Sequence, residues 1–322
     1  MRGRDLPGPA LKLGVSALML TWLFWRTDLQ RVGSLLGGLD LRLWTLCLLA
    51  YLASQVLSAY RWQRLLVAKA LPVGLGRLVS LTYAGLFFNL LLPTSLGGDV
   101  YKGYGLYRQV GHGSEAAASV LLDRLTGLAA LLLIALAAVA VVREGGGPEV
   151  TATVVMLGAG FFGGAALLRV PAARRLLLGL LARLRLGPVG QALQRVSEAI
   201  LGYAECGRAL LLALLISFGV QTISIGIFYG LSLALRQEIP LAAFCLFIPL
   251  GVLAGMLPIS LGGLGVREGA FVLLFTRVGV SPAGALALSL AWFLMVLAAG
   301  LIGGGIFVLT GPGPLAVSRR AG

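Results

Sequence analysis

The sequence has few charged residues for its length. Only 12% of its 322 residues are Asp, Glu, Lys or Arg, whereas 58% are hydrophobic. Soluble domains carry about 25% charged residues, which keep their surfaces in contact with water. A chain with so little charge cannot cover a soluble fold of this size, so the composition predicts an integral membrane protein.

Histidine and cysteine are also scarce. His112 is the only histidine, and the three cysteines, Cys47, Cys206 and Cys245, are scattered along the chain. An odd and scattered set argues against a disulfide framework, and no Cys/His spacing suits a metal site. We therefore expect neither a metal nor a cofactor.

Acidic residues are outnumbered, 12 against 26 basic ones, which gives a net charge of +14. The basic residues lie at the ends of apolar runs and in short loops, which is the positive-inside pattern of a membrane protein and not a nucleic-acid surface. We expect an inner (plasma) membrane protein with both termini in the cytoplasm and no nucleic-acid partner. The first apolar run resembles a signal peptide, but residues 22–26 (WLFWR) offer no small-residue cleavage site, so we expect a retained span.

Long apolar runs recur along the whole chain. A helix needs about 20 apolar residues to cross the hydrocarbon core of a bilayer. The runs predict about six full spans, near residues 11–25, 41–60, 116–142, 150–168, 209–235 and 283–309.

An interrupted motif occurs twice between these spans. Leu92–Asp99 and Leu257–Leu264 share the pattern Leu-Pro-x-Ser-Leu-Gly-Gly, 165 residues apart (257 minus 92). Proline removes a backbone donor and glycine permits unusual backbone angles, so both copies should break a helix. Inside a membrane such breaks are tolerated only where protein or a water-filled cavity satisfies the freed backbone groups. Two matching breaks therefore predict a transport site.

The basic loops place these breaks in the membrane. Residues 169–195 hold the most basic loop, which should be cytoplasmic. Counting from this loop, segment 77–108 begins and ends in the cytoplasm, and segment 240–277 begins and ends outside. The prediction is an all-α polytopic fold with two oppositely oriented re-entrant helical hairpins in an inverted repeat. The alternative treats both hairpins as ordinary short spans.

The whole chain, 1–322, is expected to be a single membrane domain. Residues 41–142 would form the first repeat half and residues 208–310 the inverted second half. Between them, residues 171–207 would be a cytoplasmic amphipathic connector, because leucines there alternate with arginines. The alternative is a plain linker between the halves that follows the membrane.

Charged residues within apolar segments are the strongest functional signal. Each costs about 2.5 to 3.5 kcal/mol on insertion scales unless it pairs or reaches water. Asp123 and Arg124 are adjacent, so their side chains diverge on a helix. We expect Arg124 to pair with Asp99, and Asp123 with Lys102 or Arg267. These pairs could also serve only to hold the hairpins to the spans.

A half-helix that resumes after each break would direct backbone N–H groups and a positive dipole end into the membrane, which suits a phosphate. Basic side chains nearby would add full charges. The predicted substrate-binding residues, none of them catalytic, are Asn89, Pro93, Ser95, Gly97, Gly98, Asp99, Lys102, Asp123, Arg124, Pro258, Ser260, Gly262, Gly263, Arg267 and Glu268.

Four motifs together resemble the lysylphosphatidylglycerol synthase transmembrane-region family of flippase-like proteins. They are Arg61-Trp62-x-x-Leu65-Leu66, Asn89-x-x-x-Pro93-x-x-x-Gly97-Gly98-Asp99, Asp123-Arg124-x-x-Gly127 and Pro258-x-x-x-Gly262-Gly263-x-Gly265-x-x-Glu268. The family includes the membrane half of the multiple peptide resistance factor, so the resemblance implies flipping of a lipid between leaflets. No segment resembles the soluble aminoacyl-transfer domain of the two-part proteins, so only transport is expected.

We therefore expect a lipid translocase that is not an enzyme and that moves a phospholipid or a polyprenyl-phosphate-linked headgroup. Its partner would be a membrane lipid with an anionic headgroup or phosphate, and a homo-oligomer or a complex with a lipid synthase is compatible with the sequence. The alternatives are a membrane enzyme or subunit acting on lipid-linked sugar, and a scaffold for a lipid synthase.

Overall fold

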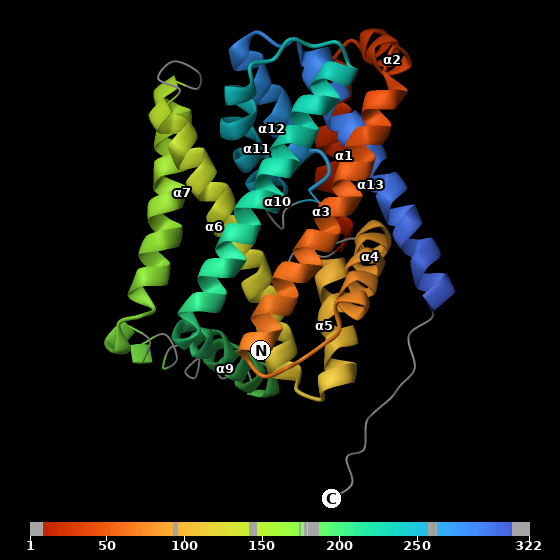
Figure 1. The fold of residues 1–322 in the computed structure, drawn as a ribbon. Coiled ribbons are helices and arrows are strands. Elements are labelled where there is room, and N and C mark those ends of the chain that lie inside the picture. Colours follow the sequence, from red (N-terminus) through yellow and green to blue (C-terminus); the bar gives the residue numbers. More distant parts are fainter. Residues whose placement is uncertain are drawn as a thin grey trace, which may run out of the picture.

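In the computed structural model of the chain, the structure describes residues 9–92, 96–141, 147–173, 175–176, 179, 187–256, 260 and 263–310. Within these ranges the regular structure is entirely helical (Figure 1). The chain is thus an all-α polytopic membrane protein, as the composition predicts.

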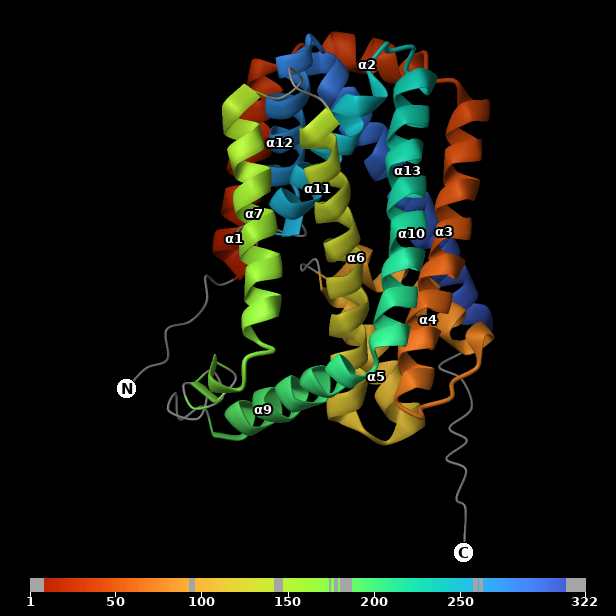
Figure 2. The same cartoon turned by 60° about the vertical axis from the view of Figure 1, so that its left-hand side comes forward.

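Five helices of the described chain are long and apolar enough to cross a membrane, and they run lengthwise through the bundle (Figures 1 and 2). They are α3 (Leu41–Ala68), α6 (Gly113–Val141), α7 (Gly147–Leu167), α10 (Gly207–Ala234) and α13 (Pro282–Thr310). These helices cover five of the six predicted spans. The remaining one, residues 11–25, lies in α1 (Pro9–Arg26), a shorter apolar helix.

The segment that joins α1 to α3 contains a short helix. This helix, α2 (Leu29–Gly37), begins where the Asp28 carboxylate accepts a hydrogen bond from the Arg31 backbone N–H at 3.0 Å. Asp40 caps α3 in the same way through the Arg42 N–H at 2.9 Å. Asp28 and Asp40 are thus helix caps, which supply acceptors to unpaired N–H groups.

Helices flank each predicted break. α4 (Leu75–Leu91) precedes α5 (Gly97–Val110), and α11 (Leu241–Met256) precedes α12 (Val266–Phe275). Each pair packs as a hairpin. The α4–α5 hairpin lies in the lower half of the bundle as drawn in Figures 1 and 2, and the α11–α12 hairpin lies in the upper half. That both hairpins re-enter a membrane and that the halves are repeats stay predictions.

Glycine allows the two arms of each hairpin to cross closely. A Cβ on Gly98 would collide with the carbonyl oxygen of Gly85 in α4. At the equivalent place in the second hairpin, a Cβ on Gly263 would collide with the carbonyl of Gly255, and Gly263 has φ +81°. Only glycine fits both positions, because any side chain would force the arms apart.

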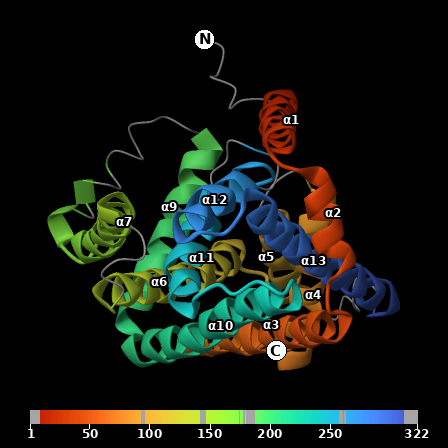
Figure 3. The same cartoon turned by 90° about the horizontal axis from the view of Figure 1, so that it is seen from above.

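The main hydrophobic core surrounds the second hairpin. Its aromatic members, Phe228, Phe244, Phe247, Phe271 and Phe275, are fully buried and pack edge to face in several pairs. Seen from above, α11 and α12 lie near the middle of the bundle, whereas α1 and α7 lie at its edge (Figure 3). The second hairpin is thus held mainly by apolar packing.

One end of the bundle is crossed by α9 (Gly187–Gly202), which η1 (Tyr203–Glu205) joins to α10 (Figure 2). The Lys69 ammonium, at the end of α3, lies 5.0 Å from the Tyr203 ring centroid in η1. This contact links η1 to the end of α3. Burial, together with the nearby carboxylate of Glu115, raises the pKa of the Tyr203 hydroxyl. The amphipathic pattern predicted for the connector falls mostly on leucines outside the described residues, namely Leu177, Leu180, Leu181 and Leu184.

Candidate functional site

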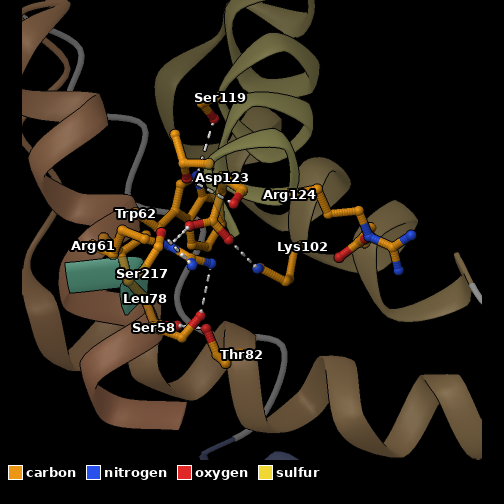
Figure 4. A network of polar contacts seen from close by, with 12 residues as sticks. Ser58, Arg61, Trp62, Leu78, Thr82, Lys102, Ser119, Asp123, Arg124 and Ser217 are labelled. Carbon is orange, nitrogen blue, oxygen red and sulfur yellow. Dashed lines mark hydrogen bonds and ion pairs between the residues drawn. The ribbon is translucent and has the colours of Figure 1, made fainter. Parts of the chain in front are cut away.

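Asp123, on α6, is the centre of a buried charge network (Figure 4). It is 3% exposed. One carboxylate oxygen accepts a hydrogen bond from the Arg61 Nε on α3 at 2.8 Å. The other lies 3.4 Å from the Lys102 Nζ on α5. A buried carboxylate is tolerated when it is paired and hydrogen-bonded, and Asp123 meets both conditions.

The two cations have further partners. The guanidinium of Arg61 also donates to Ser217 on α10 at 2.9 Å. The ammonium of Lys102 lies 4.6 Å from the Trp62 ring centroid, and the Trp62 indole donates to Ser119 at 3.1 Å. The network therefore joins α3, α5, α6 and α10, and it leaves Asp123 no access to a ligand.

Arg124 points away from this network toward Asp99 on α5, with which it forms an ion pair (Figure 4). Its side chain is 29% exposed and that of Asp99 is 20% exposed. The predicted pairs Arg124–Asp99 and Asp123–Lys102 are both present. Asp123 does not pair with the other predicted partner, Arg267, which lies on the second hairpin.

The second hairpin has its own charge pair. Arg267 donates to the Glu268 carboxylate at 2.6 and 3.1 Å. The same carboxylate accepts the Gly265 N–H at 2.7 Å, which caps the start of α12, and the Ser289 hydroxyl of α13 at 3.3 Å. Glu268 is 3% exposed, so its carboxylate is buried, whereas the Arg267 side chain is 19% exposed.

Some of the N–H groups predicted to bind a phosphate already have partners. The Asn89 side-chain oxygen accepts the Gly98 N–H at 2.7 Å at the start of α5. The Glu268 carboxylate likewise accepts the Gly265 N–H at the start of α12. The predicted residues Asn89, Gly98 and Glu268 therefore hold the resumed helices in place, and the ends of these helices are partly capped by the chain itself.

Several predicted site residues cannot be placed. Pro93, Ser95, Pro258 and Gly262 lie outside the described residues. Ser260 is 4% exposed, and its hydroxyl has no hydrogen-bond partner in the described chain. The same part of the chain contains no group of three or more His, Cys, Asp or Glu side chains that could hold a metal ion.

Arg61 belongs to the site although it is not among the residues predicted from the sequence to bind substrate. In the sequence it occurs only as part of the Arg61-Trp62-x-x-Leu65-Leu66 motif, whereas in the structure it is 6% exposed within α3. The available signal was the run Leu41–Ala68, which contains no helix breaker on either side of Arg61. Because the helix continues through Arg61, this arginine belongs to α3 and not to a loop.

Two apolar grooves approach the charge pairs. The groove between α5 and α6 has a volume of about 470 Å³, and the Asp99–Arg124 pair forms part of its wall. Its apolar lining consists chiefly of Leu96, Val100, Tyr104, Tyr107, Val120 and Leu121. We call it the α5–α6 groove.

The second groove lies between α7, α11 and α12 and has a volume of about 460 Å³. We call it the α7–α12 groove. It carries the ion pair of Arg277 and Glu149, 2.7 Å apart, and its apolar lining includes Val150, Leu157, Leu250, Leu253 and Leu274. Each groove thus combines apolar walls with one carboxylate–guanidinium pair.

Comparison with known protein families gives one match. The family model described as "Lysylphosphatidylglycerol synthase TM region" matches residues 10–304. Neither the curated proteins nor the solved structures give a match. The match covers nearly the whole chain and agrees with the motif resemblance in the sequence.

Proposed function

Because the chain belongs to the lysylphosphatidylglycerol synthase transmembrane-region family, we propose that it is a lipid translocase. It would move a phospholipid or a polyprenyl-phosphate-linked headgroup between the leaflets. In this proposal the chain is a transporter and not an enzyme. It lies in the plasma membrane with both termini in the cytoplasm, and it acts alone, as a homo-oligomer or beside a lipid synthase.

The observation that carries the proposal is the position of the Asp99–Arg124 pair in the wall of the α5–α6 groove. This pair is more exposed than the Asp123 network, whose carboxylate is only 4% exposed. A phosphate could replace Asp99 as the partner of Arg124 with little loss, because a guanidinium binds carboxylate and phosphate with similar geometry.

The groove itself suits the rest of a lipid. Val100, Tyr104 and Leu121, which line it, are 66%, 56% and 42% exposed and would face hydrocarbon. Acyl or prenyl chains could stay against these side chains while the headgroup reaches Arg124. Hydrocarbon tails therefore need not leave the bilayer while the polar group crosses.

The α7–α12 groove supports movement between two leaflets. It borders the second hairpin, in the other half of the bundle, and it also contains a charge pair, Glu149–Arg277. Transporters built from inverted repeats with broken helices expose a central site to the two sides in turn. One groove in each half of the bundle is compatible with such alternating exposure.

A proteoliposome assay with headgroup-labelled fluorescent lipids tests the proposal. Arg124→Gln should slow translocation about tenfold or more, because a hydrogen bond to a charged group contributes about 1.5 to 3 kcal/mol. Arg124→Lys keeps the charge, so its translocation rate should lie between the rates of Arg124→Gln and the native chain. The matched control is Arg108→Gln on α5, the neighbouring helix, because Arg108 is an exposed arginine outside the groove. Translocation at the native rate by folded Arg124→Gln would refute the role of the pair.

A further inference from the structure

The last turns of α1 have one exposed side and one buried side. Leu18, Trp22 and Trp25 lie at positions i, i+4 and i+7, which places them on one side of the helix. They are 72%, 51% and 86% exposed. On the opposite side, Leu23 and Thr27 are buried against the bundle. The exposed side therefore takes little part in the packing of the described chain.

The chain has five tryptophans, and the other three are held inside the bundle. Trp44 donates to a backbone carbonyl of α13 at 3.2 Å, and Trp62 donates to a serine hydroxyl of α6 at 3.1 Å. Trp292 stacks on a phenylalanine of α10, with ring centroids 4.2 Å apart. Trp25 has no hydrogen bond or ring contact within the part of the chain that the structure describes. The exposed indoles are thus gathered at the end of one helix.

The chain changes direction directly after these tryptophans. α1 runs along the bundle, whereas α2, which Asp28 caps, lies across its end (Figures 2 and 3). At the corner, the Arg26 guanidinium lies 5.4 Å from the Trp22 ring centroid, a cation–π contact. Gln30 and Arg31, in the first turn of α2, are exposed polar side chains. The exposed side therefore passes from leucine through tryptophan to charged and polar groups.

The interfacial layer of a bilayer is the environment that suits an exposed indole. In water the rings would expose a large apolar area, and in hydrocarbon the indole N–H would lack an acceptor. In the interfacial layer the rings contact acyl chains, while the N–H reaches lipid carbonyl groups and water. The Trp25 indole N–H, which has no acceptor in the described chain, fits this layer.

We propose that Trp22, Trp25 and Arg26 form a membrane-surface anchor whose partner is the phospholipid bilayer itself. The tryptophans lie in the interfacial layer, and Arg26 reaches the phosphate layer above it. Leu18 is seven residues before Trp25 (25 minus 18), about 10 Å along the helix, which places it in the hydrocarbon. The partner is the lipid surface as a whole and not a bound or translocated lipid.

The helix that carries the anchor also touches the second hairpin. Gly265, at the start of α12, has φ +85°. A Cβ on Gly265 would lie 2.9 Å from the Met19 Cβ and 3.3 Å from the Ser16 carbonyl oxygen. α1 and the start of α12 therefore cross closely, and one helix links the membrane surface to the second hairpin.

Depth-dependent quenching of tryptophan fluorescence tests the anchor in the full chain, reconstituted in phosphatidylcholine vesicles. One set of vesicles contains lipid brominated near the headgroup end of the acyl chain, and the other contains lipid brominated near its methyl end. The difference between the native spectrum and that of Trp25→Phe isolates the emission of Trp25. We expect bromine near the headgroup to remove the larger fraction of this emission, because the ring lies in the interfacial layer.

Trp44→Phe is the matched control. Trp44 lies in the first turn of α3, at the same end of the bundle, and its indole is bonded inside it. The emission lost in this variant should be quenched little by either lipid.

Three results would overturn the anchor. Stronger quenching of Trp25 by bromine near the methyl end would place the ring in the hydrocarbon. Quenching by aqueous iodide but by neither lipid would place it in water. No quenching by any of these agents would mean that another protein surface, such as a second copy of the chain, covers it.

Spin labels test the same boundary without changing a tryptophan. Leu18→Cys and Gln30→Cys are made in a chain whose three native cysteines are replaced, and both positions are exposed, so the labels should not disturb packing. The label at position 18 should be relaxed by oxygen, which dissolves in hydrocarbon, and the label at position 30 by a water-soluble nickel complex. Equal access of the nickel complex to both positions would overturn the anchor. Neither measurement involves translocation, so the anchor and the proposed function can fail separately.

Discussion

At the scale of single residues, Asp123 is the carboxylate that two buried cations of the candidate site share. Its carboxylate balances two buried cations, Arg61 and Lys102, that reach it from different helices. Desolvating charges is costly, so such a group contributes to stability only while its partners are present. Removing the carboxylate leaves both cations buried without a counter-charge.

Asp123→Asn should therefore lower the free energy of unfolding by about 3 to 5 kcal/mol, the usual cost of breaking a buried ion pair from one side. The free energy can be measured by denaturation in mixed detergent micelles. The control is Glu149→Gln, which breaks the Arg277 pair at a carboxylate that is 76% exposed and should cost less than about 1 kcal/mol. If the free energy of unfolding falls equally in the two variants, the Asp123 network does not stabilise the fold.

Part of this network could be predicted from the sequence. Asp123 and Arg124 are adjacent on one helix, so their side chains diverge and need different partners. Asp99 and Lys102, three residues apart, were the nearest oppositely charged candidates in the sequence. Arg61 could not be assigned to Asp123, because their contact joins residues 62 positions apart and depends on α3 lying against α6. Sequence spacing predicts contacts within an element and between successive elements, but it does not predict which distant helices become neighbours.

At the scale of elements, the hairpins depend on the crossing of their arms. Gly98 and Gly263 lie against the carbonyls of Gly85 and Gly255. The sequence predicted both breaks, because proline and paired glycines have local effects on the backbone. It did not predict α2, since that helix is too short and too polar to give an apolar run and depends on its Asp28 cap.

Gly98→Ala should separate α4 from α5 and reduce both the stability and the yield of folded protein, because a Cβ there overlaps a backbone oxygen that cannot move independently. Gly160→Ala is the matched control. It lies in α7 with no atom within 4 Å of the new Cβ, and alanine favours a helix by up to about 1 kcal/mol over glycine. Size-exclusion profiles and thermal unfolding compare the two variants, and a native profile for Gly98→Ala would disprove the close crossing.

For the whole molecule, the predicted topology places the ends of each hairpin on one face of the membrane, and on opposite faces for the two hairpins. In a chain whose Cys47, Cys206 and Cys245 are replaced, single cysteines at Arg77 and Arg108 should react with an impermeant maleimide from one face. Cysteines at Glu238 and Arg277 should react from the other face. Labelling of positions 77 and 108 from opposite faces would make α4 and α5 ordinary spans.

The unequal attachment of the two hairpins has a mechanical consequence. The first hairpin is tied through Lys102 and Asp123 to three long helices by buried groups. The second has one buried polar link, to α13 through Ser289, and a more exposed ion pair to α7 through Arg277, and it otherwise rests on apolar packing. Apolar contacts have no fixed direction, so they can slide without exposing a buried charge. In the proposed translocation, the half around Asp123 would then act as a stationary frame, and the α11–α12 hairpin would be the part that shifts.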